Sequence, residues 1–126
     1  MDTLLPWVAI VDDEEAIRRA LLRLMRSAGV AARAFASGAE LIALLPATAP
    51  CCVVLDIHMP GMNGLELQAR LAELAPAAGV IVMTGHHTPE EQARALQQRA
   101  RAYLLKPVND QLLLDTIAAA CPPFVQ

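Results

Sequence analysis

The sequence is poor in charge, in cysteine and in uninterrupted apolar stretches. Only 18% of its 126 residues are charged while 56% are hydrophobic, a balance that excludes a disordered chain and suits one domain with a real core. The net charge of -3 gives no general attraction to nucleic acid. No apolar run approaches the length of a membrane span, and residues 1–6 contain no basic stretch, which argues against a signal peptide.

The three cysteines predict neither a metal site nor a disulfide framework. Cys51 and Cys52 are adjacent, Cys121 is distant in the chain, and no Cys or His cluster completes a metal site. We therefore expect Cys51 and Cys52 to fill strand positions. The odd count favours a reducing compartment, and we expect a cytoplasmic protein.

Apolar stretches that end in polar or turn residues alternate with segments of helical periodicity. They predict strands at 7–11, 30–35, 51–56, 80–83 and 102–105. Helices are expected at 16–28, 38–45, 64–75, 89–100 and 110–120. The alternation predicts a single α/β domain over residues 1–126, with a parallel five-stranded sheet in the flavodoxin-like order 2-1-3-4-5 and helices on both faces.

Four of the expected strands end in residues that can do chemistry. Asp12 and Asp13 follow the first strand and Asp56 ends the third. Thr84 follows the fourth strand and Lys106 follows the fifth. Because parallel strands end at the same edge of a sheet, we expect these side chains to meet in one cleft beside the first and third strands.

Three carboxylates in one cleft need a cation or a proton between them. At an effective dielectric of about 20, one like-charge pair at ~4 Å costs about 4 kcal/mol. Carboxylate oxygens favour Mg²⁺, or Mn²⁺, over zinc. The central Asp56 is then the best nucleophile for phosphoryl transfer through an aspartyl phosphate. Lys106 and Thr84 would bind the phosphoryl oxygens.

Each of these residues also has an ordinary structural interpretation. Asp12 and Asp13 could form only an acidic helix start, and Thr84 could be a turn residue. Lys106 could be a solvated lysine and Tyr103 a plain strand aromatic. Their joint placement at strand ends favours a functional site over these separate explanations.

The motifs resemble those of the receiver domains of two-component response regulators, over nearly the whole chain. The resemblance is carried by Val-Asp-Asp-Glu-Glu at 11–15, Asp-Ile-His-Met-Pro-Gly-Met-Asn-Gly at 56–64, Met-Thr-Gly-His at 83–86 and Tyr-Leu-Leu-Lys-Pro at 103–107. The Met-Pro-Gly-Met-Asn-Gly and Thr-Gly-His segments are most similar to the FixJ-like branch.

The resemblance implies a phosphoacceptor and a metal site. Asp56 would accept a phosphoryl group from a sensor histidine kinase. Asp12, Asp13 and Asp56 would hold Mg²⁺ together with the backbone carbonyl of His58.

The resemblance also implies a conformational switch. Thr84 and Lys106 would bind the phosphoryl oxygens, and Tyr103 would turn inward as Thr84 moves toward the phosphate. A cis peptide is expected between Lys106 and Pro107. The switched surface would comprise the fourth helix, fifth strand and fifth helix, would often form a homodimer, and would control a transcriptional output or a partner.

The chain departs from the family at one position. The family usually has Gly seven residues before the lysine, where this chain has Arg99, so we expect the fourth helix to end without a left-handed residue. His58 and His86 stand two residues after Asp56 and Thr84, where the family's side chains adjust dephosphorylation. A solvated surface His is the alternative for each.

Other functions fit the residues less well. A haloacid-dehalogenase-type phosphatase needs a second Asp two residues after the nucleophile, where this chain has His58. A flavin-binding module needs a Ser/Thr/Gly-rich loop after the first strand, where Asp12 and Asp13 would repel phosphate. We therefore expect a phosphoacceptor rather than an enzyme, limited to self-catalysed phosphotransfer and autodephosphorylation. A stand-alone or degenerate receiver, acting as a phosphorelay or binding module without a DNA-binding output, is the alternative.

Overall fold

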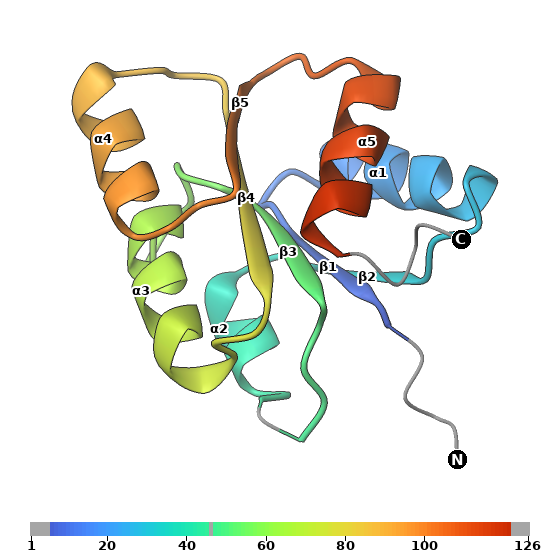
Figure 1. Cartoon of the computed structure of the whole chain (residues 1–126), viewed down its shortest axis with the longest axis horizontal. Helices are drawn as coiled ribbons and strands as arrows, with labels where there is room; N and C mark the ends of the chain where they lie inside the picture. Colours follow the sequence, from blue (N-terminus) through green and yellow to red (C-terminus); the bar gives the residue numbers. More distant parts are fainter. Residues whose placement is uncertain (1–5, 46, 122–126) are drawn as a thin grey trace.

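The computed structural model describes residues 6–45 and 47–121, and a parallel sheet forms its centre (Figure 1). The expectation that the chain has no signal peptide rests on residues 1–6, of which only Pro6 is among the described residues. The strands are β1 (Val8–Val11), β2 (Ala32–Phe35), β3 (Cys52–Asp56), β4 (Gly79–Thr84) and β5 (Ala102–Leu105). Their order is β2-β1-β3-β4-β5 and every neighbouring pair is parallel, which confirms the predicted topology.

Within the described residues, five helices connect and cover the strands: α1 (Glu15–Ser27), α2 (Gly38–Ile42), α3 (Gly64–Leu74), α4 (Pro89–Gln97) and α5 (Asp110–Ala120). The last four each begin after a residue whose side chain accepts a hydrogen bond from a backbone N–H of the first turn: Ser37, Asn63, Thr88 and Asn109. These bonds satisfy N–H groups that a helix start leaves unpaired. None of the described helices combines the length and the apolar character that a membrane crossing requires.

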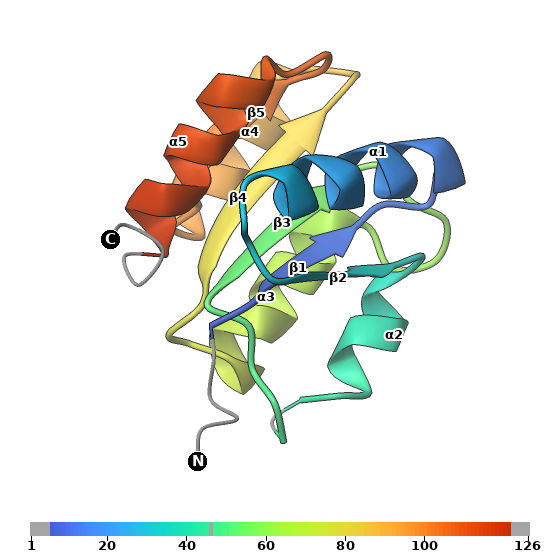
Figure 2. The same cartoon turned by 90° about the vertical axis from the view of Figure 1, so that its right-hand side faces the viewer.

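The sheet buries both of its faces. Along β1, Val8 and Ile10 pack with α1 and α5, whereas Ala9 and Val11 pack with α2, α3 and α4. Figures 1 and 2 show the same division of the helices between the two faces. Side chains alternate between faces along a strand, and two buried faces therefore produce the continuous apolar runs of the sequence.

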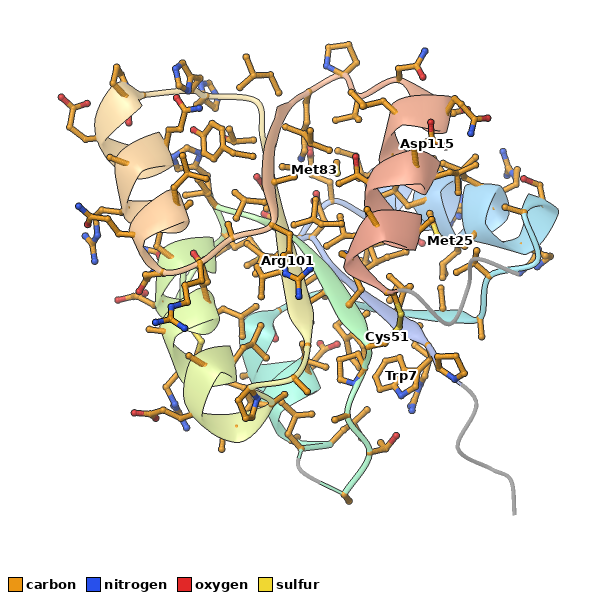
Figure 3. The ribbon with its side chains drawn as sticks, viewed as in Figure 1. Trp7, Met25, Cys51, Met83, Arg101 and Asp115 are labelled. Atoms are coloured by element: carbon orange, nitrogen blue, oxygen red, sulfur yellow. A yellow bond between two sulfur atoms is a disulfide. The ribbon has the colours of Figure 1, made fainter. Side chains whose placement is uncertain are left out.

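Cys51 and Cys121 form a disulfide, so the expectation of a chain without a disulfide framework was wrong. The bond joins the residue before β3 to the residue after α5, with 5.6 Å between the Cα atoms, and Figure 3 shows Cys51 beside the C-terminal end of α5. The cysteine count misled because pairing depends on distances that only the fold creates. Cys52 is a buried free thiol in β3.

Arg99 adopts the left-handed conformation, with φ of 72°, so the expectation that α4 would end without such a residue was also wrong. The Arg99 N–H donates to the Leu96 carbonyl at 2.9 Å, and the Ala100 N–H donates to the Ala95 carbonyl at 3.0 Å. This pair of bonds is the usual helix ending for which Gly is preferred. The left-handed conformation costs a residue with a Cβ about 1–2 kcal/mol of stability. The tertiary structure therefore imposes the turn despite the Arg side chain.

Candidate functional site

The C-terminal edge of the sheet brings the predicted site residues into one cleft of about 310 Å³. Its lining is mostly polar and consists of Asp13, Glu14, Asp56, His58, Gly85, His86 and Lys106. Asp12 and Thr84 lie beneath this lining, 2% and 0% exposed. The polar residues predicted to follow the strands therefore lie together at one edge of the sheet.

Three carboxylates form the only potential metal-binding group of His, Cys, Asp and Glu within residues 6–45 and 47–121. Asp12, Asp13 and Asp56 each offer an oxygen, and these oxygens lie within 4.8 Å of one another. Asp12 and Asp56 are buried, whereas Asp13 is exposed. A set of hard oxygen donors fits Mg²⁺ or Mn²⁺, and the repulsion among the carboxylates favours such a cation.

Lys106 reaches into this acidic cluster. Its Nζ lies 2.9 Å from Asp12 Oδ2, 3.5 Å from Asp56 Oδ2 and 4.0 Å from Glu14 Oε1. The other oxygen of Asp12, Oδ1, accepts the Glu14 N–H at 2.9 Å, so both carboxylate oxygens are held. The peptide between Lys106 and Pro107 is cis, as predicted.

The cluster changes the protonation of its members. Burial raises the pKa of Asp56 above its ordinary value, the Lys106 ammonium lowers it in part, and Asp12 raises it further. Burial lowers the pKa of Lys106, but the charges of Asp12, Asp56 and Glu14 and a hydrogen bond to Asp12 together outweigh it, so the net shift is upward. Lys106 is therefore a firmly protonated cation beside a partly desolvated carboxylate.

Thr84 connects the cleft to α4 through His58. The Thr84 hydroxyl accepts the His86 N–H at 3.1 Å and lies 3.5 Å from His58 Nδ1. His58 Nε2 donates to Glu91 Oε2 at 3.0 Å, in the first turn of α4. Sequence reasoning missed Glu91, because no motif places this residue beside His58.

Tyr103 lies against His87 in this structure. Its hydroxyl shares a hydrogen bond of 3.1 Å with His87 Nδ1, and the two rings meet edge to face with 5.5 Å between centroids. Burial and the nearby Glu91 carboxylate raise the pKa of Tyr103. His87 was missed as well, because no motif separated it from its neighbour His86.

Gly64 sets the distance between α3 and the end of β3. A Cβ at this position would overlap the backbone carbonyl oxygen of Asp56 and lie 2.7 Å from the Cα of Ile57. The Gly64 N–H donates to the Ile57 carbonyl at 2.7 Å. The start of α3 is therefore packed directly against the backbone that carries Asp56.

The fold and the cleft define a receiver domain, and comparison with known proteins agrees. Residues 8–118 match the model of the response regulator receiver domain, and the chain belongs to this family. Members of the family are phosphoacceptors of two-component systems that bind Mg²⁺ at an acidic cluster such as the one found here.

Individual relatives place the chain within this family. The C4-dicarboxylate transport transcriptional regulatory protein DctR of Rhodobacter capsulatus is 39% identical over 117 residues, covering 90% of this chain and 58% of that protein. A response regulator receiver protein from Burkholderia phymatum is 43% identical with a TM-score of 0.81, over 94% of this chain and 96% of that one. FixJ-N is 30% identical with a TM-score of 0.86, over 94% of both chains. This chain spans about half the length of the curated relatives it matches.

Proposed function

We propose that Asp56 accepts a phosphoryl group from a sensor histidine kinase in a Mg²⁺-dependent reaction, within one receiver domain spanning residues 1–126. The observation that carries this proposal is the buried Asp56 carboxylate, with Lys106 Nζ 3.5 Å away and two further carboxylates beside it. Membership of the receiver family implies a sensor histidine kinase as the partner. We propose that the protein acts in the cytoplasm.

The residues of the cleft divide the work of phosphoryl transfer. Asp12, Asp13, Asp56 and the backbone carbonyl of His58 would hold Mg²⁺, which when bound offsets negative charge on the phosphoryl oxygens. An Asp56 carboxylate oxygen forms the new bond to phosphorus while the bond to the donor's imidazole nitrogen breaks. Lys106 neutralises charge on the transferring group, and positioning supplies most of the remaining acceleration. Self-catalysed transfer from small donors and autodephosphorylation would use the same groups.

The switch begins at Thr84. Its hydroxyl would donate to a phosphoryl oxygen on Asp56 and move away from His58. That shift would break the contact between Thr84 and His58 and so weaken the hydrogen bond from His58 to Glu91 on α4. Tyr103 would then leave His87 and turn inward toward the space that Thr84 vacates.

The surface of α4, β5 and α5 would transmit the change. The exposed large hydrophobic residues of the described chain are Leu96 on α4, Leu105 on β5 and Leu112 on α5, with exposures of 50%, 53% and 49%. One apolar side chain from each element supports a homodimer or partner interface there. Several relatives are transcriptional regulators, and we propose that this surface controls a transcriptional output without touching nucleic acid itself.

Intact mass spectrometry tests the proposal. The protein should gain one phosphoryl group from acetyl phosphate with Mg²⁺, and lose this ability with a chelator or in Asp56→Asn. Thr84→Ala should still be phosphorylated but should dimerise or bind its partner poorly. Full phosphate-induced association of Thr84→Ala would refute the switch, and no mass gain in the wild type would favour the degenerate receiver.

A further inference from the structure

The disulfide between Cys51 and Cys121 lies at the edge of the sheet opposite the phosphoacceptor. Cys51 precedes β3, whose other end is Asp56, and Cys121 follows α5. We propose that Cys51 and Cys121 form a reversible thiol–disulfide switch, which responds to small disulfides such as oxidised glutathione and sets the order of the last turn of α5. The thiol chemistry is independent of phosphotransfer. Only the claim that the disulfide is reduced reversibly in a reducing compartment rests on the proposed function, which places the protein in the cytoplasm.

The two sulfurs differ in access, which gives the exchange a defined order. Cys51 is half-buried, whereas Cys121 is 1% exposed. The Cys51 thiolate attacks oxidised glutathione, forming a mixed disulfide and releasing one glutathione. The Cys121 thiolate then attacks the Cys51 sulfur and releases the second glutathione. Two protein thiols are oxidised, one glutathione disulfide is reduced, and the two released glutathione thiols carry the protons.

The surrounding backbone accommodates both redox states. Cys51 Sγ lies 3.3 Å from the Trp7 carbonyl oxygen, which can accept a hydrogen bond from the thiol S–H after reduction. The Cys51 N–H donates to the same Trp7 carbonyl at 2.9 Å, and the Gly79 N–H donates to the Cys51 carbonyl at 3.0 Å. These backbone bonds hold Cys51 in place without the disulfide, so reduction leaves β3 paired.

Cys52 does not compete for the exchange. It is fully buried in β3, and burial raises the pKa of its thiol to about 12. Cys121 is buried as well, but its sulfur is bonded to that of Cys51, whereas Cys52 is unbonded in the structure and stays a thiol in both states.

The end of α5 receives the redox signal. A Cβ on Gly79 would lie 3.0 Å from the Ala120 carbonyl oxygen and 3.1 Å from the Ala120 Cβ, so the last turn of α5 lies directly on the start of β4. Within the described residues, the Cys121 N–H donates to the Ile117 carbonyl at 2.8 Å, the side chain is buried in the apolar core, and the disulfide ties it to Cys51. Reduction removes the covalent tie and loosens this turn. The exposed Leu112 of the proposed signalling surface lies in the first turn of the same helix.

Thiol counting tests the switch. The whole chain is equilibrated in buffers of varying glutathione ratio, quenched in acid, unfolded and alkylated, and its intact mass is measured. The mass should change reversibly from one alkylated cysteine to three as the buffer becomes reducing, because the chain has three cysteines and one disulfide. Hydrogen exchange at residues 117–121 should be several-fold faster in the reduced form.

Variants separate this inference from the phosphoacceptor chemistry. Asp56→Asn should titrate like the wild type, so a failure of phosphorylation leaves the redox result standing. Cys121→Ala should show the fast exchange at the end of α5 in every buffer, and Cys52→Ala should keep the titration. If Cys52→Ala does not fold, peptide mapping of the oxidised wild type identifies the bonded pair. The proposal would be overturned if thiol counting gave three thiols at every glutathione ratio, or still gave one thiol in excess reductant. A disulfide that involves Cys52, or equal hydrogen exchange in the oxidised and reduced forms, would overturn it as well.

Discussion

Replacing Gly64 with Ala should push the first turn of α3 away from the strand that carries Asp56. The new Cβ would overlap the Asp56 carbonyl oxygen and lie 2.7 Å from the Ile57 Cα, and both are backbone atoms that no rotamer change can move. The displaced helix must also stretch the 2.7 Å hydrogen bond from the Gly64 N–H to the Ile57 carbonyl.

The size of the effect follows from this overlap. Carbon atoms pack at about 3.5–4.0 Å, so relief of the Ile57 contact requires a shift of roughly 1 Å. Overpacking costs about 1–3 kcal/mol, and a weakened hydrogen bond adds about 1 kcal/mol. We expect the free energy of unfolding to fall by about 2–4 kcal/mol. A displacement of about 1 Å near reacting groups slows a reaction by up to about 100-fold, so phosphorylation of Gly64→Ala should slow by about 10- to 100-fold.

Urea unfolding and a time course of intact mass with acetyl phosphate measure these two effects. Gly61→Ala is the matched control, because Gly61 has φ of +73° and nothing within 4 Å of an added Cβ. That variant should lose only about 1–2 kcal/mol, from the left-handed backbone, and should be phosphorylated at the normal rate. Wild-type stability and rate in Gly64→Ala would refute the close-packing argument.

Three other perturbations test separate parts of the structure. Burial raises the pKa of Asp56, so the folded state binds the Asp56 proton more tightly than the unfolded state does. The contribution of Asp56 to the free energy of unfolding therefore falls as the pH rises from about 3.9 through the folded pKa. Without metal, Asp56→Asn should therefore be more stable than the wild type at neutral pH, and urea unfolding should show the advantage disappearing in acid. Glu91→Gln weakens the 3.0 Å bond to His58, so hydrogen exchange should quicken across α4 while phosphorylation keeps its rate. Reducing the disulfide, which joins residues 70 apart, should lower the free energy of unfolding by about 4 kcal/mol in the chain-entropy model, as urea unfolding with and without dithiothreitol would measure.

Matched variants give each of these tests a contradicting outcome. Glu90→Gln removes the same charge from the exposed neighbour of Glu91 and should leave exchange across α4 unchanged. Equal hydrogen exchange in Glu91→Gln and Glu90→Gln would show that the contact between His58 and Glu91 does not restrain α4. Cys121→Ala should unfold at one midpoint regardless of reductant, and a wild type that behaves in the same way would contradict the disulfide. An Asp56→Asn variant less stable than the wild type at neutral pH would show that burial is not the dominant influence on Asp56.

The fold was predictable because its pattern is local. Apolar runs of strand length alternate with helical segments, and a parallel sheet must place the residues that follow its strands at one edge. Asp12, Asp56, Thr84 and Lys106 were found in this way. Hydrophobic periodicity fades at helix ends, and α4 ends at Gln97 rather than at the predicted residue 100.

What the sequence did not reveal depends on contacts between distant segments. Cys51 and Cys121 are separated by 70 residues, and no spacing rule predicts such a pair. The bond from His58 to Glu91 depends on how the loop after β3 meets α4. Arg99 keeps a left-handed turn because the backbone bonds that end α4 and the burial of Ala95 outweigh the preference for Gly.

The position of the phosphoryl group tests the central claim most directly. After phosphorylation with acetyl phosphate and Mg²⁺, borohydride converts an aspartyl phosphate to homoserine, and peptide mass spectrometry then locates that residue. The proposed mechanism predicts homoserine at position 56 and nowhere else in the chain. Modification at Asp12 or Asp13, or a phosphoryl group retained on His58, would contradict it.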